Sequence, residues 1–465
     1  MGTVRKPLVA TFGLLAAAVA VAVAATALAW YRLGPVARGT AWAEDGGLFL
    51  RERLQYGVDG TLLRPYAGYL HLLPRLVVDL GVHRPVEQYA LTVSAASCTV
   101  VGVVAAAVFV LSRDLVPSWP LRLLLAAVPV VFPLAPFEIS GTAANLHWYM
   151  LVLVPWLFSY RARTWWGSAV VAVLALFAVL TELQTVVFLP LLAVAWIPFL
   201  SPRGSDGRRR RGGLLALPVT VVAVVGGGVQ VAVSLLTPRA SRPGDPTLLD
   251  IANDYVLQPV AAMWSRDLAA VGRAVAADGR WVLVLPAAVV AVLLVVAVAL
   301  ANWRARVLLV ALGGGSVAVW TAALVANASA NAHWGTIDDV GLGALAPTRY
   351  AAASGMLLLS AVVLAACVLV DPRSWSRRPA GLAGPTGGTV RVVGAVCGWC
   401  LVAVVVAAAV LNAAPGPSQR SHGPTWLPQV ESSVAACRAD PGTSVSVKTA
   451  PWGAQVPCAL VLLDR

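Results

Sequence analysis

Charged side chains are scarce in this chain. Only 12% of its 465 residues are Asp, Glu, Lys or Arg, whereas 59% are hydrophobic, and the mean hydropathy is +0.80. Soluble globular domains contain about 25% charged residues. The composition therefore excludes a soluble globular protein and predicts an all-α polytopic membrane protein.

Long apolar runs recur along the chain, and most can cross a hydrocarbon core of about 30 Å as a helix. They predict about eleven transmembrane helices, with a range of roughly nine to thirteen because some runs are short or nearly continuous. The runs lie near residues 8–30, 87–111, 121–134, 143–159, 165–181, 185–200, 213–236, 281–302, 307–326, 350–370 and 391–413.

Basic residues concentrate in every second connection between these runs. Cytoplasmic loops of membrane proteins are enriched in Lys and Arg, so we expect a multi-pass protein of the bacterial plasma membrane with a cytoplasmic N-terminus and an extracytoplasmic C-terminus. The first run is longer than a signal peptide and predicts an uncleaved helix. These loops explain the net charge of +13, which therefore does not indicate a nucleic-acid partner. The basic residues expected inside are Arg5, Lys6, Arg113, Arg122, Arg161, Arg163, Arg203, Arg208 to Arg211, Arg304, Arg306, Arg373, Arg377, Arg378 and Arg391.

Acidic residues and histidines have the opposite distribution. Of the 21 acids, only Asp114, Asp206 and Asp371 fall in connections expected inside, and all five histidines fall outside. Groups suited to acid–base chemistry therefore face the outer side. We expect residues 1–413 to form a transmembrane domain without a cytoplasmic domain, and residues 414–465 to form a small extracytoplasmic tail.

The outer connections of the transmembrane domain are long, at residues 31–86, 237–280 and 327–349. In the first of them, apolar residues recur at helical spacing between Leu62 and Leu80, which predicts interfacial helices. The tail has Pro and Gly punctuation that predicts a short β-containing cap. It also holds Cys437 and Cys458, which an oxidising compartment would allow to pair.

An acid pair, Glu44-Asp45, follows the first apolar run by about 14 residues. Adjacent carboxylates repel one another, which raises the pKa of one of them and suits it to general-base catalysis. The alternative is a solvated turn at Gly46-Gly47.

Five polar side chains follow in the twelve residues from Arg64 to Arg75. Arg64 and Arg75 offer forked donors to a phosphate, whereas Tyr66, Tyr69 and His71 offer rings and further polar groups to a sugar. The alternative is an interfacial belt of aromatic and basic residues.

Further ionisable residues lie at the ends of later apolar runs. Glu138, His147 and Glu182 have strongly apolar neighbours, and ionisable groups at such depth tend to face a cavity. Arg349-Tyr350 opens the tenth run, where the Arg is suited to a lipid phosphate. The alternatives are helix-end residues in the headgroup region and a snorkelling Arg.

Nucleotide-binding and metal-binding signatures are missing. No Walker A or GxGxxG segment opens a cytoplasmic helix. His333 precedes the acid pair Asp338-Asp339 by five residues, a spacing that matches no recognised metal signature. We therefore predict no metal ligands and no cofactor, although a divalent metal is left open, and we count His333 among the substrate-binding candidates.

An acid just after the first span, a long first outer loop with interfacial helices, many spans and an Arg-Tyr pair opening a late span together resemble the GT-C superfamily of integral membrane glycosyltransferases. The resemblance implies a catalytic Asp or Glu in the first outer loop and a polyprenyl-phosphate-linked sugar as donor. It implies a glycan, lipid or protein of the cell envelope as acceptor. No full subfamily signature is present.

On this resemblance Asp45 is the first choice as base and Glu44 the second. Arg349 is the expected contact of the donor phosphate, and the remaining candidates would line the site. Two alternatives stay open: a transporter or flippase of lipid-linked glycans, and a non-enzymatic membrane scaffold. Convergence of Glu44-Asp45 and Arg349 on one outer cavity would favour the transferase.

Overall fold

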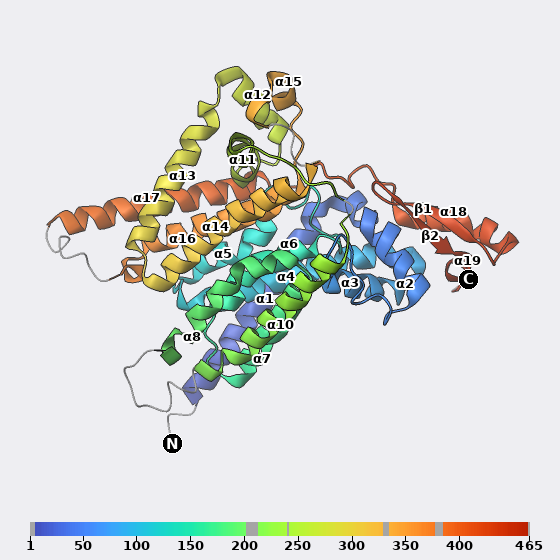
Figure 1. Ribbon diagram of the computed structural model, residues 1–465, viewed down its shortest axis with the longest axis horizontal. Helices are drawn as coiled ribbons and strands as arrows, with labels where there is room; N and C mark the ends of the chain where they lie inside the picture. The colour runs from blue at the N-terminus through green and yellow to red at the C-terminus, as the bar shows by residue number, and fades with distance from the viewer. Residues whose placement is uncertain (1–4, 201–212, 240, 329–333, 377–384, 464–465) are drawn as a thin grey trace.

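The computed structural model describes residues 5–200, 213–239, 241–328, 334–376 and 385–463, and helices dominate it (Figure 1). The longer helices are α1 (Arg5–Arg38), α4 (Tyr89–Leu111), α5 (Trp119–Val131), α6 (Leu146–Ser159), α7 (Trp165–Val179), α10 (Leu217–Leu236), α13 (Trp281–Leu300), α14 (Trp303–Ala326), α16 (Arg349–Val370), α17 (Pro385–Leu411) and α18 (Trp426–Ala439). Shorter ones include the π-helix η1 (Asp45–Leu50), α2 (Arg51–Tyr56), α3 (Leu72–Val82), the 3-10 helix η4 (Leu183–Leu191), α8 (Leu192–Leu200), α11 (Leu248–Tyr255), α12 (Leu268–Asp278), α15 (Asp339–Gly343) and α19 (Cys458–Val461).

Among the described residues, seven helical stretches are long and apolar enough to cross a membrane. Four shorter apolar helices, Trp119–Val131, Leu146–Ser159, Trp165–Val179 and Leu183–Ile197, lie between them in the chain. The expected all-α membrane architecture is therefore present. The seven stretches are Phe12–Arg38, Val86–Asp114, Leu217–Leu236, Trp281–Leu300, Trp303–Ala326, Arg349–Val370 and Gly388–Leu411.

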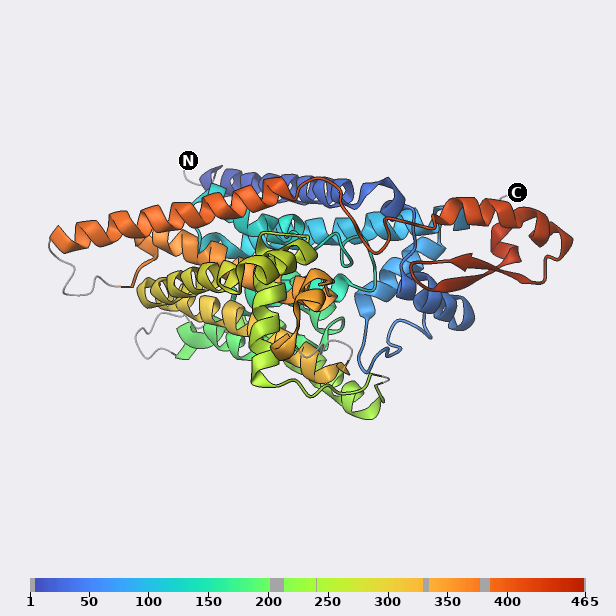
Figure 2. The same cartoon turned by 90° about the horizontal axis from the view of Figure 1, so that it is seen from above.

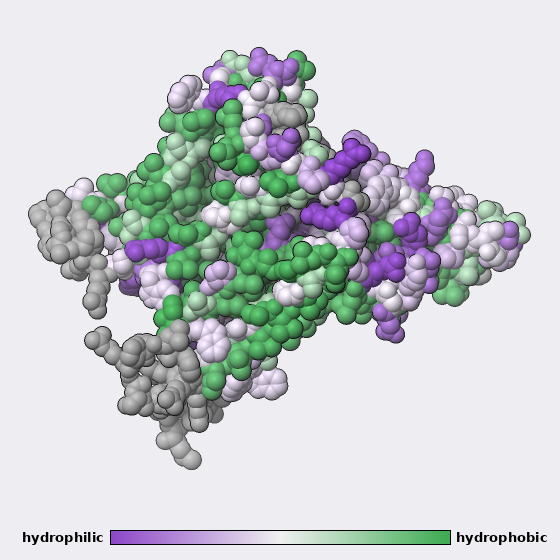
Figure 3. All heavy atoms as spheres, in the orientation of Figure 1, coloured by the Kyte–Doolittle hydropathy of each residue, from purple (hydrophilic) through white to green (hydrophobic). Residues whose placement is uncertain are grey.

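The helices at the periphery of the bundle expose large apolar side chains. Val292 and Val295 on α13 are 60% and 68% exposed, and Leu235 on α10 is 82% exposed. Figure 3 shows extended apolar surface over this part of the molecule. Water would make such surfaces costly, whereas lipid tails would cover them. The helices therefore indicate a membrane protein.

Helix α16 is at the centre of the bundle. It packs against α14, α17, α13 and α5, and its residues Ala351–Leu369 are buried. Small residues allow close approach elsewhere, as where α4 crosses α1: a side chain at Gly102 would collide with Thr26 and the carbonyl of Ala22. Close contacts through small residues are typical of helix pairs in membranes.

Contacts between connections are found within each of the two sets, those expected inside and those expected outside. Of those expected inside, Arg163 reaches Asp114 at 2.7 Å, and Asn302 N–H donates to the Ser374 carbonyl at 2.7 Å. Of those expected outside, Arg349 lies near Glu44, and Arg420 donates to the Ser140 carbonyl at 2.7 Å. Each of these four contacts joins two segments that the charge pattern places on the same side.

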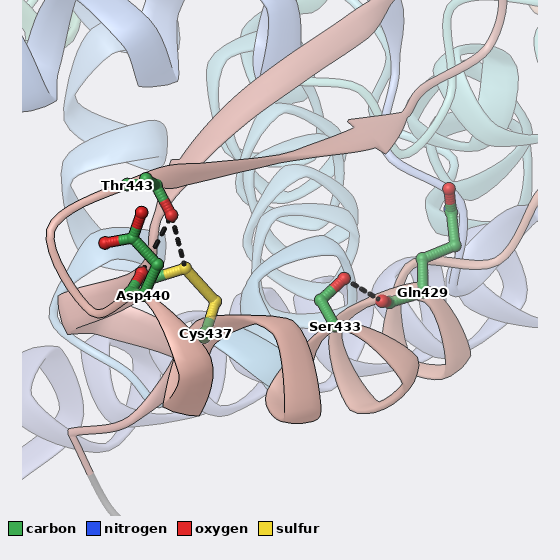
Figure 4. The surroundings of a disulfide bond; sticks show 6 residues. Gln429, Ser433, Cys437, Asp440 and Thr443 are labelled. Atoms are coloured by element: carbon green, nitrogen blue, oxygen red, sulfur yellow. Dashed lines mark hydrogen bonds between the residues drawn. A yellow bond between two sulfur atoms is a disulfide. The ribbon is translucent and has the colours of Figure 1, made fainter.

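The tail forms a small module at one end of the bundle, opposite the start of α17 (Figure 2). It contains α18, the antiparallel strands β1 (Ser444–Lys448) and β2 (Gly453–Pro457), and α19. A disulfide joins Cys437 to Cys458, with their Cα atoms 5.0 Å apart, and Thr443 Oγ1 lies 3.7 Å from Cys458 Sγ (Figure 4). The predicted β-containing cap and disulfide are thus confirmed.

Candidate functional site

The loop that carries Glu44 is held by the tail module. After α1, Ala43 N–H donates to the Ala450 carbonyl and Ala450 N–H donates to the Ala41 carbonyl, both at 3.0 Å. The tail module therefore supports the loop like an added strand. At the end of this segment Glu44 directly precedes the π-helix η1, and its side chain is buried.

Arg349 lies between two carboxylates. Its Nη1 is 3.6 Å from Glu44 Oε1 and 3.6 Å from Glu138 Oε1. The guanidinium also lies 5.5 Å from the ring centroid of Tyr350. Three segments far apart in the sequence thus meet at one cation, and Glu44 and Arg349 line the same cavity.

Asp45 points elsewhere, although it directly follows Glu44. Its two carboxylate oxygens accept hydrogen bonds from the backbone N–H groups of Ala143 and Ala144, at 2.9 and 2.7 Å. Burial raises the pKa of Asp45 to about 7, while these amides and Arg420 act in the opposite direction. Both oxygens of Asp45 are engaged and Asp45 does not line the cavity, whereas Glu44 does. The structure therefore places the second candidate of the acid pair, and not the first, at the cavity.

A tight turn places the aromatic residues of the first outer loop. Tyr66 and Tyr69 exchange backbone hydrogen bonds of 2.9 and 3.1 Å across Ala67-Gly68, both of which have positive φ. Gln230 of α10 fixes the next residue by accepting from the Leu70 N–H at 2.9 Å. Such a turn projects both tyrosines toward the cavity that they line.

The ionisation states of Tyr66, Tyr69 and His71 follow from their burial. Burial and then the charge of Glu44 raise the pKa of Tyr66 to about 12, and burial and Glu182 raise the pKa of Tyr69 well above its usual value. Burial and then His147 lower the pKa of His71 well below its usual value. The two phenols and the His71 imidazole are therefore neutral near pH 7.

Arg64 and Arg75 do not line the cavity, which corrects their expected role. Both bind Glu52 instead: Arg75 Nη1 is 2.7 Å from Glu52 Oε2, and Arg64 Nε is 3.2 Å from Glu52 Oε1. Arg75 also lies over the Phe49 ring at 4.9 Å. Arg75 therefore fastens the start of α3 to α2, and Arg64 fastens the connection between these helices to α2.

His147 and Glu182 form a pair on another wall of the cavity. The Nδ1 atom of His147 is hydrogen-bonded to Glu182 Oε2, and Glu182 Oε1 accepts from the Gln184 N–H at 2.8 Å. Both side chains are buried. The His147 ring lies 4.0 Å from the Trp148 ring and 5.9 Å from the His71 ring, measured between centroids.

These groups surround a cavity of about 540 Å³, which is large enough for a sugar and its phosphate. Three of its lining side chains have a buried polar atom without a hydrogen-bond partner: Glu44 Oε2, Trp148 Nε1 and Gln184 Oε1. Buried polar atoms are rarely left unpaired. The cavity is therefore equipped for a polar ligand.

Arg239 is a lining residue that sequence reasoning missed. It packs against Gly68, where an added Cβ would lie 2.6 Å from Arg239 Cγ. No described carboxylate lies within ion-pair distance of it, in contrast to Arg349. Arg239 could have been noticed in the sequence as the first basic residue after the run 213–236. An ordinary interfacial Arg occupies the same kind of position, so this signal is weak.

His333 lies outside the described residues. Within the described part of the chain, no group of three or more His, Cys, Asp or Glu could hold a metal ion.

Comparison with known proteins identifies no relative: no family model matches the chain, and neither curated proteins nor solved structures show significant similarity to it.

Proposed function

We propose that this chain is a membrane glycosyltransferase of the GT-C type. It would move a sugar from a polyprenyl-phosphate donor to a glycan, lipid or protein acceptor of the cell envelope. The observation that supports this most is the meeting of Glu44 and Arg349 in one cavity, with Arg239 as a second cation.

In this proposal Glu44 is the general base. The acceptor hydroxyl gives its proton to Glu44 as its oxygen forms a bond to the anomeric carbon of the donor sugar. The bond between that carbon and the phosphate oxygen breaks, and its electron pair stays on the lipid phosphate. The unpartnered Oε2 of Glu44 supports this role, because a base needs a free oxygen within reach of the hydroxyl.

The leaving phosphate needs positive charge rather than a proton. Arg239 is the stronger candidate, since no described carboxylate neutralises it, whereas Arg349 is shared between Glu44 and Glu138. We therefore assign Arg239 to the phosphate, and Arg349 both to the phosphate and to the orientation of Glu44.

The proposed topology has all eleven apolar helices crossing a bacterial plasma membrane, with the cavity at the extracytoplasmic end. The four shorter helices would span together with the irregular segments that follow or precede them. No connection expected inside is long enough to bind a nucleotide sugar. A donor that is already attached to a membrane lipid would supply sugar at the outer face.

The test is sugar transfer by the purified protein in lipid nanodiscs, with radiolabelled polyprenyl-phosphate sugars as donors. Glu44→Gln should lower turnover by about 10²–10⁴-fold, because an amide cannot accept the proton. Glu431→Gln, which changes an exposed carboxylate of α18, is the matched control. Full activity of Glu44→Gln would remove the proposed base. Movement of the lipid across the bilayer without transfer would favour a flippase instead.

A further inference from the structure

The wall of the cavity that contains the His147–Glu182 pair has no role in the proton transfer or in phosphate binding. It consists of His147, Trp148, Glu182 and Gln184, and we call it the dyad wall. It comes from two segments, the start of α6 and the turn between α7 and η4, and all four residues line the cavity.

The dyad wall contains hydrogen-bonding groups that have no partner within the described protein. Trp148 Nε1 is a donor without a partner, on a side chain that is only 2% exposed, and Gln184 Oε1 is an acceptor without one. Leaving such a group unsatisfied costs about 1–3 kcal/mol. A donor and an acceptor that line one cavity suit a ligand with several hydroxyl groups, because each hydroxyl both donates and accepts.

His147 adds a third group of fixed orientation. Because Glu182 engages Nδ1, only Nε2 is left for a ligand. Glu182 is itself held by the Gln184 N–H. A carboxylate that fixes the ring in this way presets both its direction and its tautomer, so Nε2 can read one hydroxyl position.

Aromatic rings complete the surroundings. Tyr69 lies 6.1 Å from His147, and Tyr350 lies 5.7 Å from Trp148, between ring centroids. Ring faces of this kind cover the apolar C–H groups of a sugar while its hydroxyls reach polar atoms. The acids Glu44 and Glu182 disfavour a second negative charge in the same cavity.

From this geometry we infer that the dyad wall is a binding subsite for an uncharged sugar ring, held by its hydroxyls while the attached phosphate lies at Arg239 and Arg349. The inference rests on the proposed transferase function and deepens it. It assigns sugar recognition to one wall and phosphate recognition to another.

The experiment compares binding of three lipids to the protein in nanodiscs: undecaprenyl phosphate, the same lipid carrying a neutral hexose or pentose, and the same lipid carrying glucuronic acid. Wild type should bind one or more neutral sugar lipids at least tenfold more tightly than the bare lipid and the glucuronyl lipid. Trp148→Phe and Gln184→Met keep the shape of the wall, so each should reduce that preference by about tenfold. The exposed Trp166→Phe is the matched control.

The outcomes separate the inference from the function on which it rests. Arg239→Ala should weaken the binding of all three lipids by the same factor. If wild type binds all three equally, or if both wall variants keep the full preference, the dyad wall is not the sugar subsite, although the phosphate assignment stands. If the glucuronyl lipid binds as tightly as the neutral ones, the restriction to uncharged sugars is wrong. If no lipid phosphate binds, the proposed function itself fails.

Discussion

Glu44 and Asp45 are neighbours in sequence but have different surroundings. Glu44 faces the cavity with one oxygen unpartnered, whereas Asp45 joins its loop to residues 143–144 through two backbone N–H donors. Arg420 stabilises the charge of Asp45 from the tail. The first acid is thus available for chemistry, and the second holds the first in place.

Asp45→Asn is therefore expected to affect stability more than chemistry. An amide can accept one of the two backbone hydrogen bonds but presents an N–H₂ group to the other donor, which costs about 1–3 kcal/mol. Thermal unfolding in detergent should show the loss, and turnover should fall much less than in Glu44→Gln. Asp59→Asn, at an exposed turn, is the control. Unchanged stability together with a large loss of turnover would return the base to Asp45.

The pH dependence should reflect Glu138. Burial raises its pKa to about 7, against the influence of Arg349. Above that pH the ionised carboxylate shares Arg349 with Glu44. Below it Glu138 is protonated, Arg349 binds Glu44 alone, and the Glu44 carboxylate is less free to engage the acceptor hydroxyl. We expect kcat/KM to fall as the pH drops through about 7.

The same profile measured on variants identifies the titrating group. Glu138→Gln should lower activity above neutral pH and lack the inflection, because its side chain cannot ionise. Glu431→Gln should retain it. Since burial also places the pKa of Asp45 at about 7, loss of the inflection in Asp45→Asn but not in Glu138→Gln would assign it to Asp45 instead.

Among the larger elements, the tail module is bound to the loops around the site. Arg420 is buried and donates to the carbonyls of Thr40, Ser140 and Gly141 and to Ser94 Oγ. Trp426 adds two bonds, from its backbone N–H to the Gly39 carbonyl and from its indole to the Val86 carbonyl, each 2.7 Å long. The tail therefore fixes the loop that presents Glu44.

Arg420→Ala should release the tail and destabilise the protein. Removing the guanidinium leaves several buried acceptors unpaired, for a loss on the order of 3 kcal/mol. Faster limited proteolysis after residue 414 and a lower unfolding temperature would show it. Arg420→Lys should recover part of the loss, and Arg438→Ala on the exposed side of α18 should change little. A tail that resists protease equally in Arg420→Ala would contradict this role.

The helical membrane architecture could be predicted because apolar runs are a property of the sequence alone, whereas, among the described residues, seven of the eleven expected helices are long enough to span by themselves. The orientation of single side chains could not. A π-helix beginning at Asp45 orients Glu44 toward the cavity and Asp45 away from it, and no local sequence pattern predicts this π-helix. Arg64 and Arg75 were expected at a phosphate, yet Glu52, which is 12 and 23 residues away from them, binds both.

The candidate site could be predicted only in part from the sequence, for a similar reason. Glu44, His147, Glu182 and Arg349 were recognisable because ionisable groups are unusual beside apolar runs. Their pairing depends on how distant helices pack, as between Arg349 and Glu138. Arg239, Trp148 and Gln184 lack such a signal: each type is common at membrane interfaces or helix ends.

At the scale of the whole molecule, contacts join connections that the charge pattern places on the same side, as between Arg163 and Asp114 and between Arg349 and Glu44. The cavity is lined by residues of the connections expected outside and by the adjoining ends of helices such as α6 and α14. A membrane-embedded bundle can keep its acids and histidines on one side in this way. The side on which they lie decides which substrates can reach them.

The final prediction therefore concerns orientation. Half of the 34 basic side chains fall in the connections expected inside, so residue 205 should lie in the cytoplasm and residue 421 outside. In a background without the four cysteines outside the disulfide, Ser421→Cys should react with a membrane-impermeant maleimide in intact cells. Ser205→Cys should react only after permeabilisation. Labelling of Ser205→Cys in intact cells, with Ser421→Cys protected, would place Glu44 and Arg349 in the cytoplasm and remove the reason for a lipid-linked donor.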